Sequence, residues 1–194
     1  MVRFFSFAIL SSILLAGFAE AQKGAPAGEW PSYGGDLGHT RYSALDQVNA
    51  SNFSELEVAW TFDAANFGPT PEYRFQSTPL MVNGKIYTTA GSRRAVVSLD
   101  AKTGEILWTH SLDEEERGQY APRQLSGRGL AHWESDSTGE EQIIYVTPGY
   151  QMIALNAAKG TRVSSFGEDG IVDLKQNADQ QIDLVTGEIG LHST

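Results

Sequence analysis

The chain has 194 residues, of which 24 are acidic and 14 are basic, so its formal net charge is −10 at pH 7. This balance excludes the basic surface that nucleic-acid binding requires, and the absence of cysteine excludes disulfides, thiolate metal sites and cysteine nucleophiles. The 20 glycines and the 20% share of charged residues favour a loop-rich β fold over a helical one.

The first residues have the pattern of an export signal. Arg3 precedes an almost wholly apolar run over 4–18, and Ala19-Glu20-Ala21 is a small-x-small cleavage site before Gln22. The apolar run is shorter than the roughly 20 residues that span a bilayer, and a buried helix is the plainer alternative. We predict a signal peptide over 1–21 and a periplasmic mature chain over 22–194. Association with the inner membrane through an uncleaved signal is the second alternative.

Strand patterns follow a leader rich in aromatic and turn residues. Residues 56–62 alternate between polar and apolar side chains and predict a strand. Asn83-Gly84 lies between two apolar-rich runs and is a strong hairpin signal, because both turn positions require positive φ. The pattern around this turn predicts one sheet with strands over 77–82, 85–89, 95–99 and 105–108.

A repeated unit indicates the architecture. Residues 98–108 contain a strand end, the turn Asp100-Ala101-Lys102-Thr103-Gly104 and a strand that runs into Trp108. The stretch Leu155-Asn156-Ala157-Ala158-Lys159-Gly160 echoes the turn 56 positions later, and Ile86-Tyr87 recurs as Ile144-Tyr145 after 58. A recurring all-β unit of this length is typical of β-propeller blades. The second blade is predicted to have strands over 142–147, 151–155 and 161–166, after a charged, glycine-rich insertion over 113–137 whose acidic run 113–116 is expected to be a solvated loop.

The predicted fold class is therefore all-β, a partial β-propeller. Ser193-Thr194 repeats Ser77-Thr78 where a third blade would open. A propeller closes with about 4–8 blades, and two blades alone would leave an apolar face and a sheet edge uncovered. We expect residues 22–194 to be the N-terminal part of a longer propeller domain.

These motifs together resemble those of the pyrroloquinoline-quinone (PQQ) dependent dehydrogenases, the quinoproteins that oxidise glucose, methanol and other alcohols. The resemblance rests on the opening over 30–36, the strand pattern over 56–62, the blade motif ending in Trp108, and Gly127-Arg128-Gly129-Leu130-Ala131-His132-Trp133. It implies the first blades of an eight-bladed propeller. The alcohol and methanol branches carry a Cys-Cys pair just before the arginine, where this chain has Gln124-Leu125-Ser126, so the chain is more similar to the glucose dehydrogenase branch.

The resemblance implies three PQQ-binding residues. Arg128 matches the arginine that approaches the reactive quinone oxygens, where a fixed cation stabilises the charge of reduction; an exposed loop arginine is the plainer interpretation. Thr147 aligns with a threonine whose hydroxyl bonds a PQQ carboxylate, although a strand threonine is commonly only a β-former. Gln76 stands where relatives carry a cofactor-contacting glutamate, and it keeps the hydrogen-bonding capacity without the charge.

Aromatic residues near these positions have less specific roles. His132 and Trp133 follow Arg128 and are predicted to line the substrate pocket, with a packed aromatic pair as the alternative. Trp60 and Trp108 are predicted to pack between blades rather than to bind a ligand. The family's Ca²⁺ ligands and catalytic aspartate are expected beyond residue 194, so the resemblance places no catalytic and no metal-binding residue in this chain.

The predicted function is that of a periplasmic PQQ- and Ca²⁺-dependent dehydrogenase of a glucose-like sugar or an alcohol, with ubiquinone or a cytochrome as electron acceptor. Taken alone, these 194 residues are expected to be inactive. The alternative is a cofactor-free propeller scaffold of the outer-membrane assembly type, whose members lack the Arg-Gly loop and carry a lipoprotein cysteine. A short binding module is a third alternative, which the missing blades disfavour.

Overall fold

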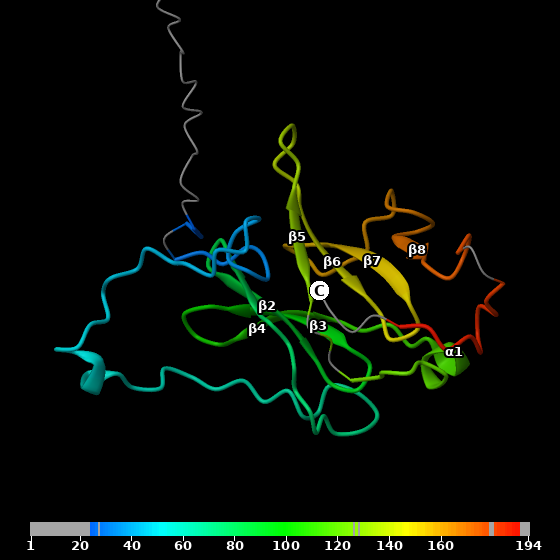
Figure 1. Cartoon of the computed structure of the whole chain (residues 1–194), viewed down its shortest axis with the longest axis horizontal. Coiled ribbons are helices and arrows are strands. Elements are labelled where there is room, and N and C mark those ends of the chain that lie inside the picture. The colour runs from blue at the N-terminus through cyan, green and yellow to red at the C-terminus, as the bar shows by residue number, and fades with distance from the viewer. Residues whose placement is uncertain (1–23, 27, 126, 128, 179–180, 191–194) are drawn as a thin grey trace, which may run out of the picture.

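The computed structural model describes residues 24–26, 28–125, 127, 129–178 and 181–190. The predicted signal peptide over 1–21, Arg128 and the Ser193-Thr194 repeat lie outside the described residues. Within the described ranges, no helix has the length and hydrophobicity of a membrane span. The described chain forms two four-stranded antiparallel sheets with little helix (Figure 1).

The first sheet follows the predicted pattern closely. Its strands are β1 (Leu80–Val82), β2 (Lys85–Ala90), β3 (Ala95–Asp100) and β4 (Ile106–His110), hydrogen-bonded in that order. Asn83 and Gly84 join β1 to β2 with φ of 50° and 73°, the left-handed values that an Asn-Gly hairpin requires. All four predicted strands of this sheet are therefore confirmed.

The second sheet differs from the prediction at both edges. It consists of β5 (Ala131–Glu134), β6 (Glu141–Val146), β7 (Gln151–Asn156) and β8 (Ile171–Asp173). The central strands β6 and β7 were predicted, whereas β5 lies in the stretch that was assigned to the insertion. The prediction of a strand over 161–166 is wrong. These residues make one isolated bridge, between Arg162 and Leu155, and the Phe166 N–H donates to the Val163 carbonyl at 2.9 Å, which closes a turn.

The two sheets share one hydrophobic core. The first sheet contributes Leu80, Val82, Tyr87 and Val96, and the second contributes Ile143, Tyr145, Ile153 and Leu155. The other face of the first sheet is covered by the segment 60–67, which packs against Val97 and Leu99. The strand β3 is therefore buried on both faces, as expected of a strand inside a stack of sheets.

Each tryptophan of the repeated motif packs on the turn of the next unit. Trp60 Nε1 donates to the Ala101 carbonyl at 3.2 Å, and Trp108 Nε1 donates to the Ala157 carbonyl at 3.0 Å. A Cβ atom added to Gly160 would lie 2.4 Å from the Trp108 ring, and this glycine has a φ of 69°. The packing role predicted for both tryptophans is confirmed, and the turn glycine supplies the space and the backbone conformation that the packing needs.

The stretch 56–62 is not a strand. It follows the short 3₁₀ helix η1 (Phe53–Glu55), and the chain around η1 runs away from both sheets (Figure 1). Val58 is 82% exposed, whereas Trp60 and Phe62 contact the first sheet. Alternation alone does not make a strand, because a strand also needs a neighbouring edge to pair with, and the described residues place none beside 56–59.

Candidate functional site

The strand directions bring Gln76 and Thr147, two of the predicted site residues, to one end of the two sheets. The strand β1 begins shortly after Gln76, β5 begins shortly after position 128, and β6 ends just before Thr147. Antiparallel order places these points, together with the β2–β3 turn, at the same end. We call this end, formed by residues 76–79, 91–94, 111–125, 127, 129–130 and 147–150, the loop end.

Side chains of the first sheet hold the segment 123–127 at the loop end. Thr89 Oγ1 donates to the Gly127 carbonyl at 2.7 Å. Arg94, only 3% exposed, donates through Nε to the Leu125 carbonyl at 3.2 Å and through Nη2 to the Arg123 carbonyl at 3.4 Å. The residues that lead to Arg128 in the sequence are thereby attached to β2 and to the β2–β3 turn.

Gln76 contacts the same segment. Its side-chain oxygen accepts a hydrogen bond from the Arg123 guanidinium. The predicted cofactor residue Gln76 therefore lies against Arg123, five positions before Arg128 in the sequence, although 47 positions separate Gln76 from Arg123. Arg123 was not predicted as a site residue, and no local pattern marks it.

Among its described residues the loop end gathers four arginines and four acidic residues, Arg93, Arg94, Arg117 and Arg123 with Asp113, Glu114, Glu115 and Glu116. The hydrogen bonds of Arg94 go to backbone carbonyls and that of Arg123 goes to a neutral carboxamide. Burial, and then the charge of the nearby Arg123 guanidinium, lower the pKa of Arg94 to about 10, while the Glu114 carboxylate acts in the opposite direction. Arg93 and Arg117, in contrast, form ion pairs with Asp113 and Asp173.

Thr147 is fully enclosed by protein groups. It is 1% exposed, its hydroxyl donates to Glu114 Oε1 at 2.6 Å, and its oxygen accepts from the Gln151 N–H at 3.0 Å. The second Glu114 oxygen accepts from the Gly149 N–H at 2.7 Å. The expectation that residues 113–116 form a solvated face is therefore wrong for Glu114, whose carboxylate binds the β6–β7 turn.

The helix α1 (Glu115–Gln119) is fastened to the same turn. Arg117 donates to the Gly149 carbonyl at 2.7 Å and forms a two-pronged ion pair with Asp173, at 2.8 and 2.6 Å. Hydrogen bonding from Arg117 holds the pKa of Asp173 below its ordinary value. The polar contacts of Glu114 and Arg117 thus attach the segment 114–117 to the second sheet.

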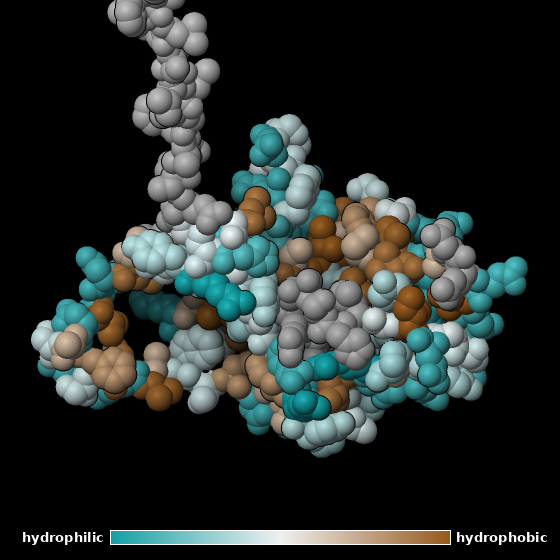
Figure 2. Space-filling view, viewed as in Figure 1, coloured by the Kyte–Doolittle hydropathy of each residue, from teal (hydrophilic) through white to brown (hydrophobic). Residues whose placement is uncertain are grey.

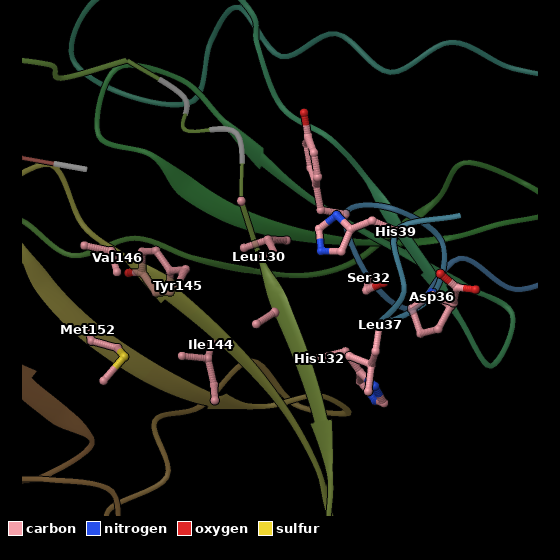
Figure 3. Close-up of a pocket in the computed structure, with 14 residues that line it drawn as sticks. Ser32, Asp36, Leu37, His39, Leu130, His132, Ile144, Tyr145, Val146 and Met152 are labelled. Atoms are coloured by element: carbon pink, nitrogen blue, oxygen red, sulfur yellow. The ribbon is translucent and has the colours of Figure 1, made fainter. Parts of the chain in front are cut away.

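His132 and Trp133 lie on opposite faces of β5, because successive strand residues point to opposite sides. His132 lines an apolar cavity of about 560 Å³ between β5, β6 and the N-terminal loop that carries Ser32, Leu37 and His39 (Figure 3). Apolar residues also gather on the surface over β6 and β7 (Figure 2). Trp133 is 47% exposed and lines a separate hollow with Gln142 and Phe166. The structure brings His132, and not Trp133, to the large cavity.

Within the part of the chain that the structure describes, no three histidine, aspartate or glutamate side chains are grouped so that they could hold a metal ion. The loop end gathers guanidinium, carboxamide and hydroxyl groups together with the Asp113 and Glu114 carboxylates. The guanidinium groups among them suit an anionic organic molecule.

Comparison with known proteins gives a consistent answer. The family model described as glucose/ethanol/alcohol dehydrogenase, beta-propeller domain (PQQ) matches residues 30–193. The glycerol dehydrogenase large subunit of Gluconobacter oxydans is 27% identical over 84% of this chain and 23% of its own length. The dehydrogenase subunit of the alcohol dehydrogenase (quinone) from the same organism is 34% identical over 75% of this chain and 18% of its own length.

Solved structures agree with these sequence matches. The quinohemoprotein alcohol dehydrogenase of Comamonas testosteroni has a TM-score of 0.60 and 28% identity, covering 79% of this chain and 20% of that one. A europium-containing methanol dehydrogenase has a TM-score of 0.55 and 27% identity, covering 70% of this chain and 22% of that one. The chain therefore spans about a fifth of the length of the relatives that it matches.

Proposed function

The chain belongs to the PQQ-dependent glucose, ethanol and alcohol dehydrogenase propeller family, and from this premise we propose that it forms the N-terminal part of a periplasmic PQQ-dependent dehydrogenase. The substrate is a glucose-like sugar or an alcohol, and the electron acceptor is ubiquinone or a cytochrome. The observation that carries the proposal is the convergence of Gln76 and the segment 123–127 at one end of both sheets.

The groups at the loop end suit PQQ, a planar ortho-quinone with three carboxylates. Arg123 offers guanidinium donors and Gln76 offers its carboxamide to the PQQ carboxylates. We assign Arg128, between Gly127 and Gly129 in the sequence, to the quinone oxygens. PQQ, when bound, supplies the oxidising quinone; the chain's own part is to bind it, orient it and offer fixed positive charge.

Thr147 and a Ca²⁺ ion are the two further groups that we propose to act on PQQ. The Thr147 hydroxyl donates to Glu114, so a bond from Thr147 to a PQQ carboxylate requires that the hydroxyl turn away from Glu114. Ca²⁺ is proposed as the Lewis acid beside the quinone, with ligands supplied by protein segments other than the described residues. The europium-containing methanol dehydrogenase is a relative that contains a metal ion.

The test uses the protein made from its complete reading frame, supplied with PQQ and Ca²⁺, with dye reduction followed on glucose, glycerol and ethanol. We expect a substrate-dependent rate, and Arg128→Ala should lower kcat about 10²-fold, the usual cost of removing one charge-stabilising donor. Arg162→Ala is the matched control, since its partner is the exposed Asp169. Full activity of Arg128→Ala would refute the role assigned to that residue.

The alternative is the cofactor-free scaffold. It predicts that the protein gives no PQQ-dependent change in tryptophan fluorescence and no rate with any of the three substrates. The proposed export is tested separately: protein recovered from the periplasmic fraction should begin at Gln22, and a protein that stays in the cytoplasm with Met1 at its start would contradict it.

A further inference from the structure

Arg94 is a buried cation whose hydrogen bonds all go to backbone oxygens. It lies in the β2–β3 turn, and besides its bonds to the Arg123 and Leu125 carbonyls it donates through Nη1 to the Val146 carbonyl at 2.9 Å. Val146 is the last residue of β6. One side chain therefore joins the first sheet, the second sheet and the segment 123–127. The mechanism proposed above makes no use of it.

The backbone at Arg94 is unfavourable for an arginine. Its φ is 53°, in the left-handed region that favours glycine and asparagine. This backbone conformation costs free energy, and the contacts of the buried Arg94 side chain must offset that cost. The fit of Gly127 supports this view, because a Cβ atom added there would lie 2.7 Å from Arg94 Nε. The guanidinium and the segment are thus packed directly against each other.

We propose that Arg94 is a positioning residue of the cofactor site, which holds the segment 123–125, just ahead of Arg128 in the sequence, against the ends of both sheets. The inference rests on the proposed function for the identity of the cofactor. Thr89, which donates to the Gly127 carbonyl, is the second anchor. The guanidinium is suited to this task since its donors spread over a planar fork and reach three carbonyls at once.

The experiment compares Arg94→Asn, Arg94→Lys and Arg93→Asn in the protein made from the complete reading frame. Asparagine tolerates the left-handed backbone, so Arg94→Asn removes the anchor without adding strain. Arg93 is the matched control, because it is the adjacent arginine in the same turn, is 40% exposed and pairs with Asp113. Arg94→Lys keeps the positive charge, and it is the variant to compare with the parent if Arg94→Asn does not fold.

The first readout needs no cofactor: the rate at which trypsin cuts after Arg123, followed by mass spectrometry. We expect Arg94→Asn to be cut at least about tenfold faster than the parent, since the segment opens more often, Arg94→Lys to fall between them, and Arg93→Asn to match the parent. Equal rates for the parent and both Arg94 variants would overturn the anchor.

The second readout is the Kd for PQQ, from the quenching of tryptophan fluorescence. Arg94→Asn should raise it about tenfold, while the substrate KM at saturating PQQ stays unchanged. Faster cutting with an unaltered Kd would overturn the positioning role. If the parent itself does not bind PQQ, the proposed function and the positioning role both fail, while the trypsin rates still decide whether Arg94 anchors the segment.

Discussion

Polar side chains at the loop end bind backbone atoms far away in the sequence. Arg94, Thr89 and Arg117 all donate to carbonyls at least 29 positions away in the sequence. Local pattern does not predict such roles, because an arginine in a hairpin turn is ordinarily exposed. Gln76, Thr147 and Arg128 were predicted only through family resemblance. The structure adds Arg94, Arg123 and Glu114 to the same end.

His110 makes the stability of the protein depend on pH. Its Nε2 atom is buried without a hydrogen-bond partner among the described residues, and its ring lies 6.1 Å from that of Tyr145. Burial, and then the charge of Arg162, lower the pKa of His110 below the ordinary 6.5. The unfolded chain therefore takes up a proton near pH 6.5 that the folded chain does not, and stability falls as the pH drops through that value.

The measurement is urea unfolding between pH 5 and pH 8. We expect the free energy of unfolding to decline on the acid side of about pH 6.5, and the decline to be smaller in His110→Phe. His39→Asn serves as the control, because it removes a histidine and leaves His110 in place. A slope that persists unchanged in His110→Phe would contradict the assignment.

At the scale of elements, the blade turn occurs a third time. Asp183 Oδ1 accepts from the N–H groups of Val185 and Thr186 at 2.9 and 2.7 Å, as Asp100 Oδ1 does from Lys102 and Thr103 at 2.9 and 2.8 Å. The repeated Asp-x-x-Thr-Gly-Glu-Ile in the sequence was a signal for it that was missed. In place of a tryptophan, the buried Lys175 donates to the Leu184 carbonyl at 3.3 Å, the position equivalent to Ala101 and Ala157.

Tryptophan packing on the turns can be measured with two glycine variants. Gly160 and Gly84 have φ of 69° and 73°, but an added Cβ meets the Trp108 ring only at Gly160 and nothing within 4 Å at Gly84. Gly84→Ala should cost about 1 kcal/mol from the backbone alone, and Gly160→Ala about 2–4 kcal/mol because the ring must also move. If chemical denaturation gives the same loss of unfolding free energy for both variants, the contact between Gly160 and Trp108 contributes nothing to stability.

At the scale of the molecule, the shared core couples the two sheets. Tyr87 and Val96 of the first sheet pack with Ile143 and Ile153 of the second, and the Tyr87 hydroxyl donates to the Ala157 carbonyl at 3.1 Å across the sheets. Neither sheet can therefore lose its partner without exposing apolar surface. We expect both to unfold in one transition.

Ile153→Ala tests this coupling, since Ile153 is completely buried in the second sheet. It should lower the free energy of unfolding by about 2–5 kcal/mol and speed hydrogen exchange in β2 and β3 as well as in β6 and β7. Ile106→Ala, at a residue that is 46% exposed, should cost much less. Faster exchange confined to the second sheet would argue against a common core.

The sequence by itself determined the turns, the first sheet, the two central strands of the second and the packing role of the tryptophans, because these depend on residues close together in the chain and on a motif that repeats. Tertiary structure alone decided that 161–166 turns away from β7, that His132 and Trp133 face opposite ways, and that Arg94 and Glu114 are engaged at the loop end. The hydrogen-bond partners of the Arg94 and Glu114 side chains lie 29 to 52 positions away in the sequence, and no local pattern records which distant group a side chain will meet.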